Sequence, residues 1–174
     1  FCRLDPVPLS TAAQPNLATC VRVGGGVAGQ AAFDPGSNLV YVADASAGSK
    51  GAYRLNYDPN TETVGNPGLL AAGQIQDSGG PRAATLGPDG KLYLGLSNSQ
   101  IVRITTPSGL SQTVEVVGAT SNGLPALSFS FVGNDLYIAE TIRVTKVINM
   151  AACFPGSCRS AALTDINVLA PVSM

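Results

Sequence analysis

The sequence predicts an all-β protein built from repeated, four-stranded antiparallel sheets. Only 12% of the 174 residues are charged and 45% are hydrophobic, so the charged share is about half of the usual ~25%. The 20 glycines and 12 prolines favour a chain with many turns. Runs that alternate between apolar and polar residues recur between these turns, which is typical of β-strands.

Three segments share one pattern of two strands around a turn. They are AAFDPGSNLVYVADAS at 31–46, AATLGPDGKLYLGLSN at 83–98 and SFSFVGNDLYIAET at 128–141. In each, a short apolar strand leads through a polar turn into a second strand that contains a tyrosine. These tyrosines are 52 and 44 residues apart, within or near the spacing of propeller blades. The three are Tyr41, Tyr93 and Tyr137.

A third and a fourth strand follow in each unit. The third strands are AYRLNY at 52–57, IVRIT at 101–105 and VTKVIN at 144–149. A second turn leads to a fourth segment such as QTVEVVG at 112–118, and a Gly-rich connector precedes the next unit. Each predicted unit is therefore four short antiparallel strands joined by tight turns.

The number of units is too small for a closed ring. Residues 17–23 (LATCVRV) have the pattern of an outer strand with no unit before them, and the last unit ends in INVLAPV at 166–172. The prediction is a β-propeller-like array of about three blades plus an orphan strand, whereas a propeller typically closes with four to eight blades. Open ends expose apolar sheet faces, which is unfavourable. We expect a fragment of a larger propeller; the alternative is that further copies or partner subunits complete the ring.

The domain boundaries follow from this count. We expect an N-terminal segment at 1–29 that carries the orphan strand and a disulfide, and propeller blades over 30–174. The three blades are predicted at about 30–72, 73–120 and 121–174.

Two segments resemble a known family. PRAATLGPDGKLYLGLSNSQIVRI at 81–104 and GQAAFDPGSNLVYVADAS at 29–46 are similar to NHL repeats and to the blades of six-bladed SMP-30/gluconolactonase-like propellers. The third unit is less similar because it lacks the proline of the turn. The resemblance implies a propeller, while members of these families include ligand-binding modules, RNA-binding domains, lactonases and lyases, so fold does not decide the function.

The four cysteines predict disulfides. Four cysteines allow three pairings, and the local pairs are Cys2–Cys20 and Cys153–Cys158. A zinc site is the alternative, but the first pair has the wrong spacing and the protein has no histidine. Disulfides indicate an extracellular or periplasmic location.

Two acidic residues are candidates for a metal site. Asp44 and Glu140 occupy equivalent positions just after the tyrosine strand, where the second unit has Leu96. The resemblance to lactonase-like propellers implies acidic ligands at the axial ends of blades, and oxygen ligands suit Ca²⁺ or Mg²⁺. The alternative is that both carboxylates make hydrogen bonds in turns. Apart from this site we predict no cofactor.

Basic and aromatic residues also recur in register. Arg54, Arg103 and Lys146 share one position of the third strands, and we expect them to be exposed residues that alternate with core neighbours. We predict that the shared tyrosines pack between blades. The phenylalanines expected in the same layer are Phe33, Phe129 and Phe131.

Several chemistries lack their residues. The chain has no histidine to serve as a base and no G-x-S-x-G. A net charge of −1 gives no footprint for nucleic acid, and no apolar run approaches the ~20 residues of a membrane span.

The function predicted from these residues is a non-catalytic interaction or scaffold module of a secreted or cell-surface assembly. Its partners would be other protein subunits, or the remainder of the polypeptide, that complete the ring. An SMP-30/gluconolactonase-like metal-dependent hydrolase or lyase is one alternative. A ligand- or glycan-binding propeller is another, although the chain has no tryptophan.

Overall fold

The computed structural model describes residues 21–25, 28–61, 63–65, 67–71, 75, 79–120, 123–141, 143–152 and 163–166. Within them the chain forms three antiparallel sheets, one after another along the sequence. The first blade contains β1 (Ala28–Asp34), β2 (Leu39–Asp44), β3 (Gly51–Asp58), β4 (Thr63–Val64) and β5 (Gly68–Leu70). The second contains β6 (Pro81–Leu86), β7 (Leu92–Leu96), β8 (Gln100–Ile104) and β9 (Val114–Ala119). The third contains β10 (Ser128–Val132), β11 (Asp135–Ala139), β12 (Val144–Val147) and β13 (Leu163–Ile166), with the short 3-10 helix η2 (Met150–Ala152) after β12.

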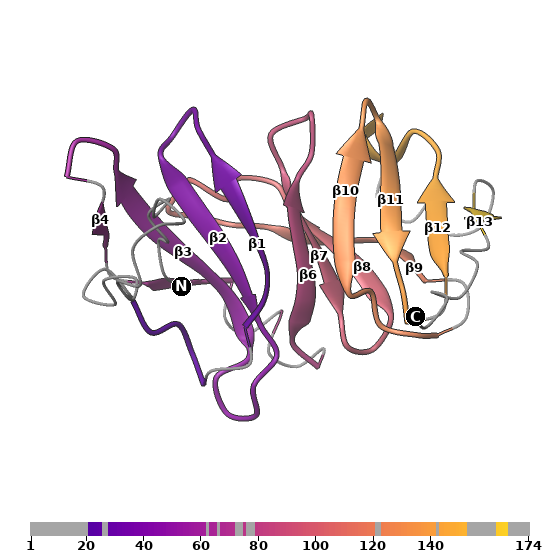
Figure 1. Ribbon diagram of the computed structural model, residues 1–174, viewed down its shortest axis with the longest axis horizontal. Coiled ribbons are helices and arrows are strands. Elements are labelled where there is room, and N and C mark those ends of the chain that lie inside the picture. The colour runs from indigo at the N-terminus through magenta and orange to yellow at the C-terminus, as the bar shows by residue number, and fades with distance from the viewer. Residues whose placement is uncertain are drawn as a thin grey trace, which may run out of the picture.

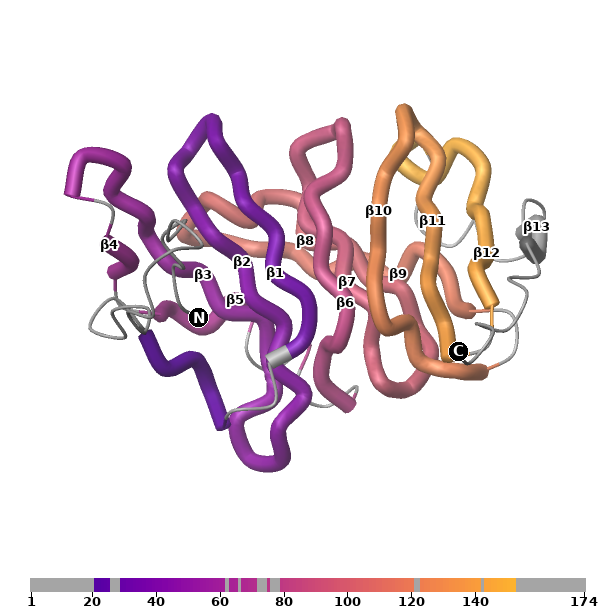
Figure 2. The backbone as a smooth tube through the Cα atoms, in the orientation of Figure 1, coloured from indigo at the N-terminus to yellow at the C-terminus, as the bar shows by residue number. Residues whose placement is uncertain are grey.

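The three blades stand side by side (Figures 1 and 2). The second and third blades each follow the simple order of four neighbouring strands, and in the first blade both β4 and β5 pair with β3. The first strand of the middle blade, β6, lies against both β1 and β10. The first and third blades therefore form the two ends of the array, which confirms the predicted all-β, propeller-like array of three blades.

The turn between the first two strands of each blade has a residue with positive φ. These residues are Asn38 (53°), Gly90 (72°) and Gly133 (59°). Asparagine and glycine adopt this conformation at low cost, which explains why the three turns recur as DPGSN, PDG and VGN.

Two apolar clusters hold the blades together. One joins the first blade to the second and includes Tyr41 and Leu94. The other joins the second blade to the third and includes Tyr93 and Phe129. A third cluster, with Val40 and Leu55, lies on the side of the first blade that faces away from the second.

Some details differ from the sequence-based predictions. Residues 21–23, the described part of the expected orphan strand, lie outside any strand. The last strand among the described residues is β13 at Leu163–Ile166, and the predicted strand at 166–172 lies outside them except for its first residue. Phe33 was expected between blades but is 50% exposed, because among the described residues no blade lies on that side of the first blade.

Candidate protein-interaction site

One pair of side chains recurs at the same place in every blade. The tyrosine of the second strand lies directly opposite a basic residue of the third: Tyr41 faces Arg54, Tyr93 faces Arg103 and Tyr137 faces Lys146. Residues opposite one another in antiparallel strands share a face of the sheet. We call the side that carries this pair the forward face of a blade and the opposite side its rear face.

The forward face of the first blade packs on the rear face of the second. Tyr41 is buried in one cluster with Leu92 and Leu94 of the second blade. The Nη1 group of Arg54 donates to the carbonyl oxygens of Ser108 and Gly109, at 2.8 and 2.9 Å. These residues lie in the turn between the last two strands of the second blade. The basic residue thus links its own blade to a turn of the next one.

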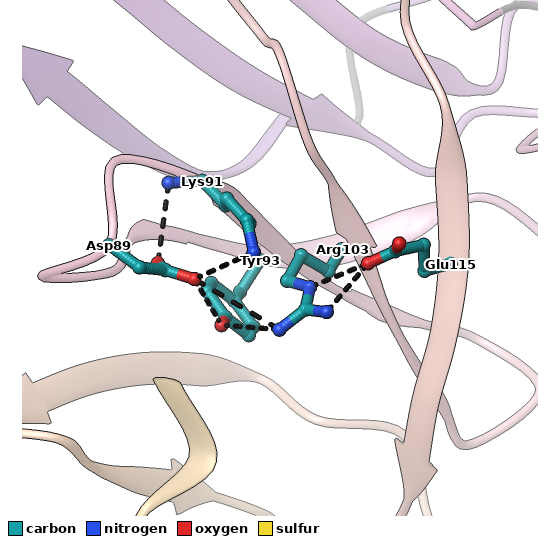
Figure 3. A network of polar contacts seen from close by, with 5 residues as sticks. All are labelled: Asp89, Lys91, Tyr93, Arg103 and Glu115. Atoms are coloured by element: carbon teal, nitrogen blue, oxygen red, sulfur yellow. Dashed lines mark hydrogen bonds and ion pairs between the residues drawn. The ribbon is translucent and has the colours of Figure 1, made fainter. Parts of the chain in front are cut away.

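The forward face of the second blade holds a polar network, shown in Figure 3. The Nε and Nη2 groups of Arg103 donate to Oε2 of Glu115, at 2.8 and 2.6 Å. Its Nη1 group donates to the Tyr93 hydroxyl at 3.4 Å, and that hydroxyl donates to Oδ2 of Asp89 at 3.0 Å. Nζ of Lys91 lies 3.4 Å from the same Asp89 oxygen. The network satisfies the polar ends of a buried tyrosine and a buried arginine.

The tyrosine and the arginine of this network are both buried. Burial raises the pKa of the Tyr93 hydroxyl from 10.0 to about 12, and the nearby Asp89 carboxylate also raises it. Arg103 itself is only 3% exposed, so the prediction that this arginine is an exposed residue of the pleat was wrong. The reason is that the third blade covers the forward face of the second.

An aromatic contact joins the second and third blades. The ring of Phe131 on β10 meets Tyr93 edge to face, with ring centroids 5.0 Å apart. Phe131 pairs with Leu136, the residue directly before the third tyrosine. In the second blade, Leu86 holds the matching position opposite Leu92 and packs against the cluster of Tyr41. In each interface between two blades, the tyrosine on the forward face of one blade thus packs with the residue at this position on the rear face of the next.

Close approach of these two blades also depends on Gly95. A Cβ atom at Gly95 on β7 would lie 2.7 Å from Cβ of Ala126 and 2.9 Å from Cζ of Phe129. Both distances are shorter than real Cβ contacts. The glycine therefore provides space on the forward face for the rear face of the third blade.

The third blade presents the same forward face at the end of the array. Lys146 lies over the Tyr137 ring at 5.5 Å, and its Nζ is 2.7 Å from Oδ2 of Asp135. The hydrogen bond from Lys146 lowers the pKa of the Asp135 carboxyl, and the bond to Asp135 raises the pKa of the Lys146 ammonium. Tyr137 is only half-buried and belongs to none of the three clusters of described residues.

The opposite end of the array presents the matching rear residue. Phe33 pairs with Val40, the residue directly before Tyr41, and so holds the position of Leu86 and Phe131. Its ring meets Tyr57 edge to face at 5.8 Å and is half exposed. The two ends of the array thus carry residues at the positions that meet in the internal interface between the second and third blades.

One glutamine connects the first strands of all three blades. On β1, Nε2 of Gln30 donates to the Phe129 carbonyl at 2.8 Å, and its Oε1 accepts from the amide groups of Phe129 (2.7 Å) and Ala84 (3.3 Å). These backbone groups lie on β10 and β6. Next to it, a Cβ at Gly29 would lie 2.0 Å from the Arg82 carbonyl oxygen. Sequence reasoning missed this junction, because nothing in the local pattern distinguishes Gln30 from a surface residue.

The two predicted metal ligands lie in different blades, each with protein partners. Oδ2 of Asp44 accepts from the Gly25 amide at 2.8 Å, and its Oδ1 accepts from the Ser46 amide at 2.9 Å and from the Ser46 hydroxyl. Oε2 of Glu140 accepts from Nε of Arg143 at 2.7 Å, and Oε1 accepts from the Thr145 hydroxyl at 3.3 Å.

Both carboxylates already accept hydrogen bonds from protein donors, so binding a cation would mean replacing these donors. Among the described residues, no three His, Cys, Asp or Glu side chains are grouped as a metal site would require. Metal binding by Asp44 and Glu140 stays a prediction.

Other predictions fall outside the described residues. All four cysteines lie there, so the disulfides stay predictions. In the part of the chain that the structure describes, no helix is long and apolar enough to cross a membrane.

Comparison with solved structures supports the fold. The chain is similar to a gluconolactonase from Xanthomonas campestris, with a TM-score of 0.52 and 13% identity, over 74% of this chain and 44% of the other. It is also similar to a luciferin-regenerating enzyme, with a TM-score of 0.49 and 22% identity, over 66% of this chain and 37% of the other. Both are β-propeller enzymes. At this identity the likeness to the gluconolactonase shows the fold alone, that of a partial propeller.

The chain spans less than half the length of either structure. No protein-family model matches it, and no curated protein sequence does. The resemblance to NHL repeats therefore stays a prediction from the sequence.

Proposed function

We propose that this chain is a non-catalytic interaction or scaffold module that binds protein β-sheets at the two ends of its blade array. One observation carries the proposal. The third blade repeats, on its half-buried forward face, the tyrosine and basic residue with which the first two blades each dock the next sheet. A repeated docking face at the end of an array favours a protein partner there.

The half-exposed Phe33 at the other end supports the same function. Large aromatic side chains are enriched in protein interfaces, and here the residue at the matching place of the third blade is already an interface residue. The predicted disulfides of the four cysteines place this module, within the proposal, in an extracellular or periplasmic assembly. Its partners are other subunits or further blades of the same polypeptide.

Lysine acetylation in the native assembly tests the proposal, because two lysines form a matched pair. The side chains of Lys146 and Lys91 are 28% and 30% exposed, and each is ion-paired with an aspartate. Only Lys146 lies on the forward face of the third blade. We expect Lys146 to react more slowly than Lys91 in the assembly and at a similar rate in the dissociated chain. Equal rates in the assembly would contradict a docked forward face.

A metal-dependent hydrolase or lyase is the second candidate. The fold likeness to a gluconolactonase favours it, and Asp44 and Glu140 would be among its ligands. This candidate predicts a stoichiometric amount of calcium or magnesium in the purified protein, lost in an Asp44→Asn variant. Elemental analysis that finds neither metal would exclude it.

A further inference from the structure

We propose that the partner at both ends is a second copy of this chain. The forward face of the third blade of each copy docks on the rear face of the first blade of the other, head to tail. Each copy uses both of its ends, so the pair closes on itself. This inference rests on the proposed function, because it names the partner of the same faces.

The first argument is the match of residues across the new interface. Inside the chain, Tyr93 on a forward face meets Phe131 on a rear face at 5.0 Å. Phe33 holds the position of Phe131, opposite the residue directly before the tyrosine. Tyr137 holds the position of Tyr93. Phe33 of one copy and Tyr137 of the other can therefore form the contact that already joins the second and third blades.

The second argument is the apolar rear face around Phe33. Val40 and Leu55, paired across β2 and β3, hold the positions of Leu92 and Ile104 in the second blade. Leu92 and Ile104 pack against the forward face of the first blade. Val40 and Leu55 are themselves only 4% and 0% exposed, in a cluster with Val23, whereas Phe33 remains half exposed. The contact therefore centres on Phe33.

The third argument is charge. Between the first and second blades, Arg54 reaches the turn between the last two strands of the next blade. Lys146 holds the position of Arg54. In a second copy, the turn that corresponds begins at Asp58, an exposed carboxyl whose pKa is lowered by hydrogen bonds from Asn60 and Thr61. A basic residue of one copy thus faces an ionised acidic residue of the other.

The fourth argument is closure. When each copy docks its forward end on the rear end of the other, no blade face is left at the end of an array, which is the general reason that propellers form rings.

Light scattering on the purified chain and two variants tests the inference. We expect wild type to have twice the chain mass of 17.6 kDa. Phe33→Glu and Tyr137→Glu should each give a monomer, because each introduces a charge into both copies of the contact. In an equimolar mixture, one chain of each variant should pair into a dimer. In such a mixed pair, one of the two interfaces carries neither substitution. Leu110→Glu, at a 98% exposed leucine outside both faces, is the control that should stay dimeric.

The following outcomes overturn the inference or separate it from the proposed function. A monomeric wild type over the whole concentration range, or a dimer that resists both substitutions, overturns the inference. Sensitivity to Tyr137→Glu alone indicates two forward faces in contact and also overturns it. The milder Phe33→Ala and Tyr137→Ala, checked by circular dichroism, show whether a lost dimer reflects lost folding. If the purified chain is monomeric but Lys146 is still protected from acetylation in the native assembly, the partner is not a second copy, and the proposed function stands. If Lys146 is not protected in the assembly, both the inference and the proposed function are contradicted.

Discussion

At the scale of single residues, Arg103 shows how the array uses polar side chains between sheets. It is 3% exposed and shares Oε2 of Glu115 between two of its nitrogen atoms. Two such bonds from one planar guanidinium fix the geometry more firmly than an ammonium can. Arg54 and Lys146 lack a Glu115 equivalent, because Gly68 and Thr164 occupy the opposite positions. These two basic residues are therefore bonded elsewhere, to turn carbonyls and to Asp135.

We predict that Arg103→Met destabilises the protein by about 2–4 kcal/mol, because it leaves Glu115 and Tyr93 without their buried partner. Arg82→Met is the matched control, since Arg82 is exposed and lies in the same sheet. It should change the free energy of unfolding by less than about 0.5 kcal/mol. Urea unfolding of both variants measures the difference, and equal small effects would show that the network adds no stability.

Tyr93 makes stability depend on alkaline pH. Burial raises its pKa in the folded protein to about 12, above the ordinary 10.0. The folded state therefore holds the proton more tightly, and the stability that neutral Tyr93 contributes is complete below about pH 10 and declines toward pH 12. Burial also raises the pKa of Tyr41, so Tyr93→Phe should reduce this decline without abolishing it. Unfolding midpoints between pH 8 and 11.5 give the two slopes; identical slopes would contradict the assignment to Tyr93.

At the scale of strands, Gln30 is the link between blades. Its side-chain amide satisfies backbone groups on the first strands of both other blades. Buried backbone groups without partners are costly. We predict that Gln30→Met, which keeps the shape and removes the polar atoms, destabilises the protein by about 1–3 kcal/mol.

Hydrogen exchange locates this effect. The Phe129 and Ala84 amides should exchange faster in Gln30→Met than in wild type. Gln112→Met is the control, because the Gln112 side chain bonds within its own turn, to the Gly109 carbonyl. It should leave both amides unchanged. Unaltered exchange at Phe129 in Gln30→Met would contradict a junction at Gln30.

The strands also show what a sequence can and cannot predict. Recurring turns and alternation located the three blades, because each unit is encoded by local chemistry. The sequence also placed Arg54, Arg103 and Lys146 in register, but it did not reveal that Arg103 is buried, since burial depends on the neighbouring blade. Phe33 and Phe131 hold the same position of the repeat. They differ in exposure only because one blade is terminal, and no local pattern carries that difference.

At the scale of the whole molecule, the central claim is that the two ends of the array are the halves of one interface. Tyr137 and Phe33 lie at opposite ends, in the third and first blades. Inside the chain, their counterparts Tyr93 and Phe131 are in contact. A ring of blades brings such ends together, whereas an open array leaves them apart.

A photo-cross-linking residue at position 137 tests this claim most directly. With benzoylphenylalanine in place of Tyr137, irradiation of the assembled protein should yield a linked pair of chains, and the captured peptide should contain Phe33. The same residue in place of the exposed Leu110 should yield no such product. Capture of any peptide far from Phe33, or no product above the Leu110 control, would contradict the account.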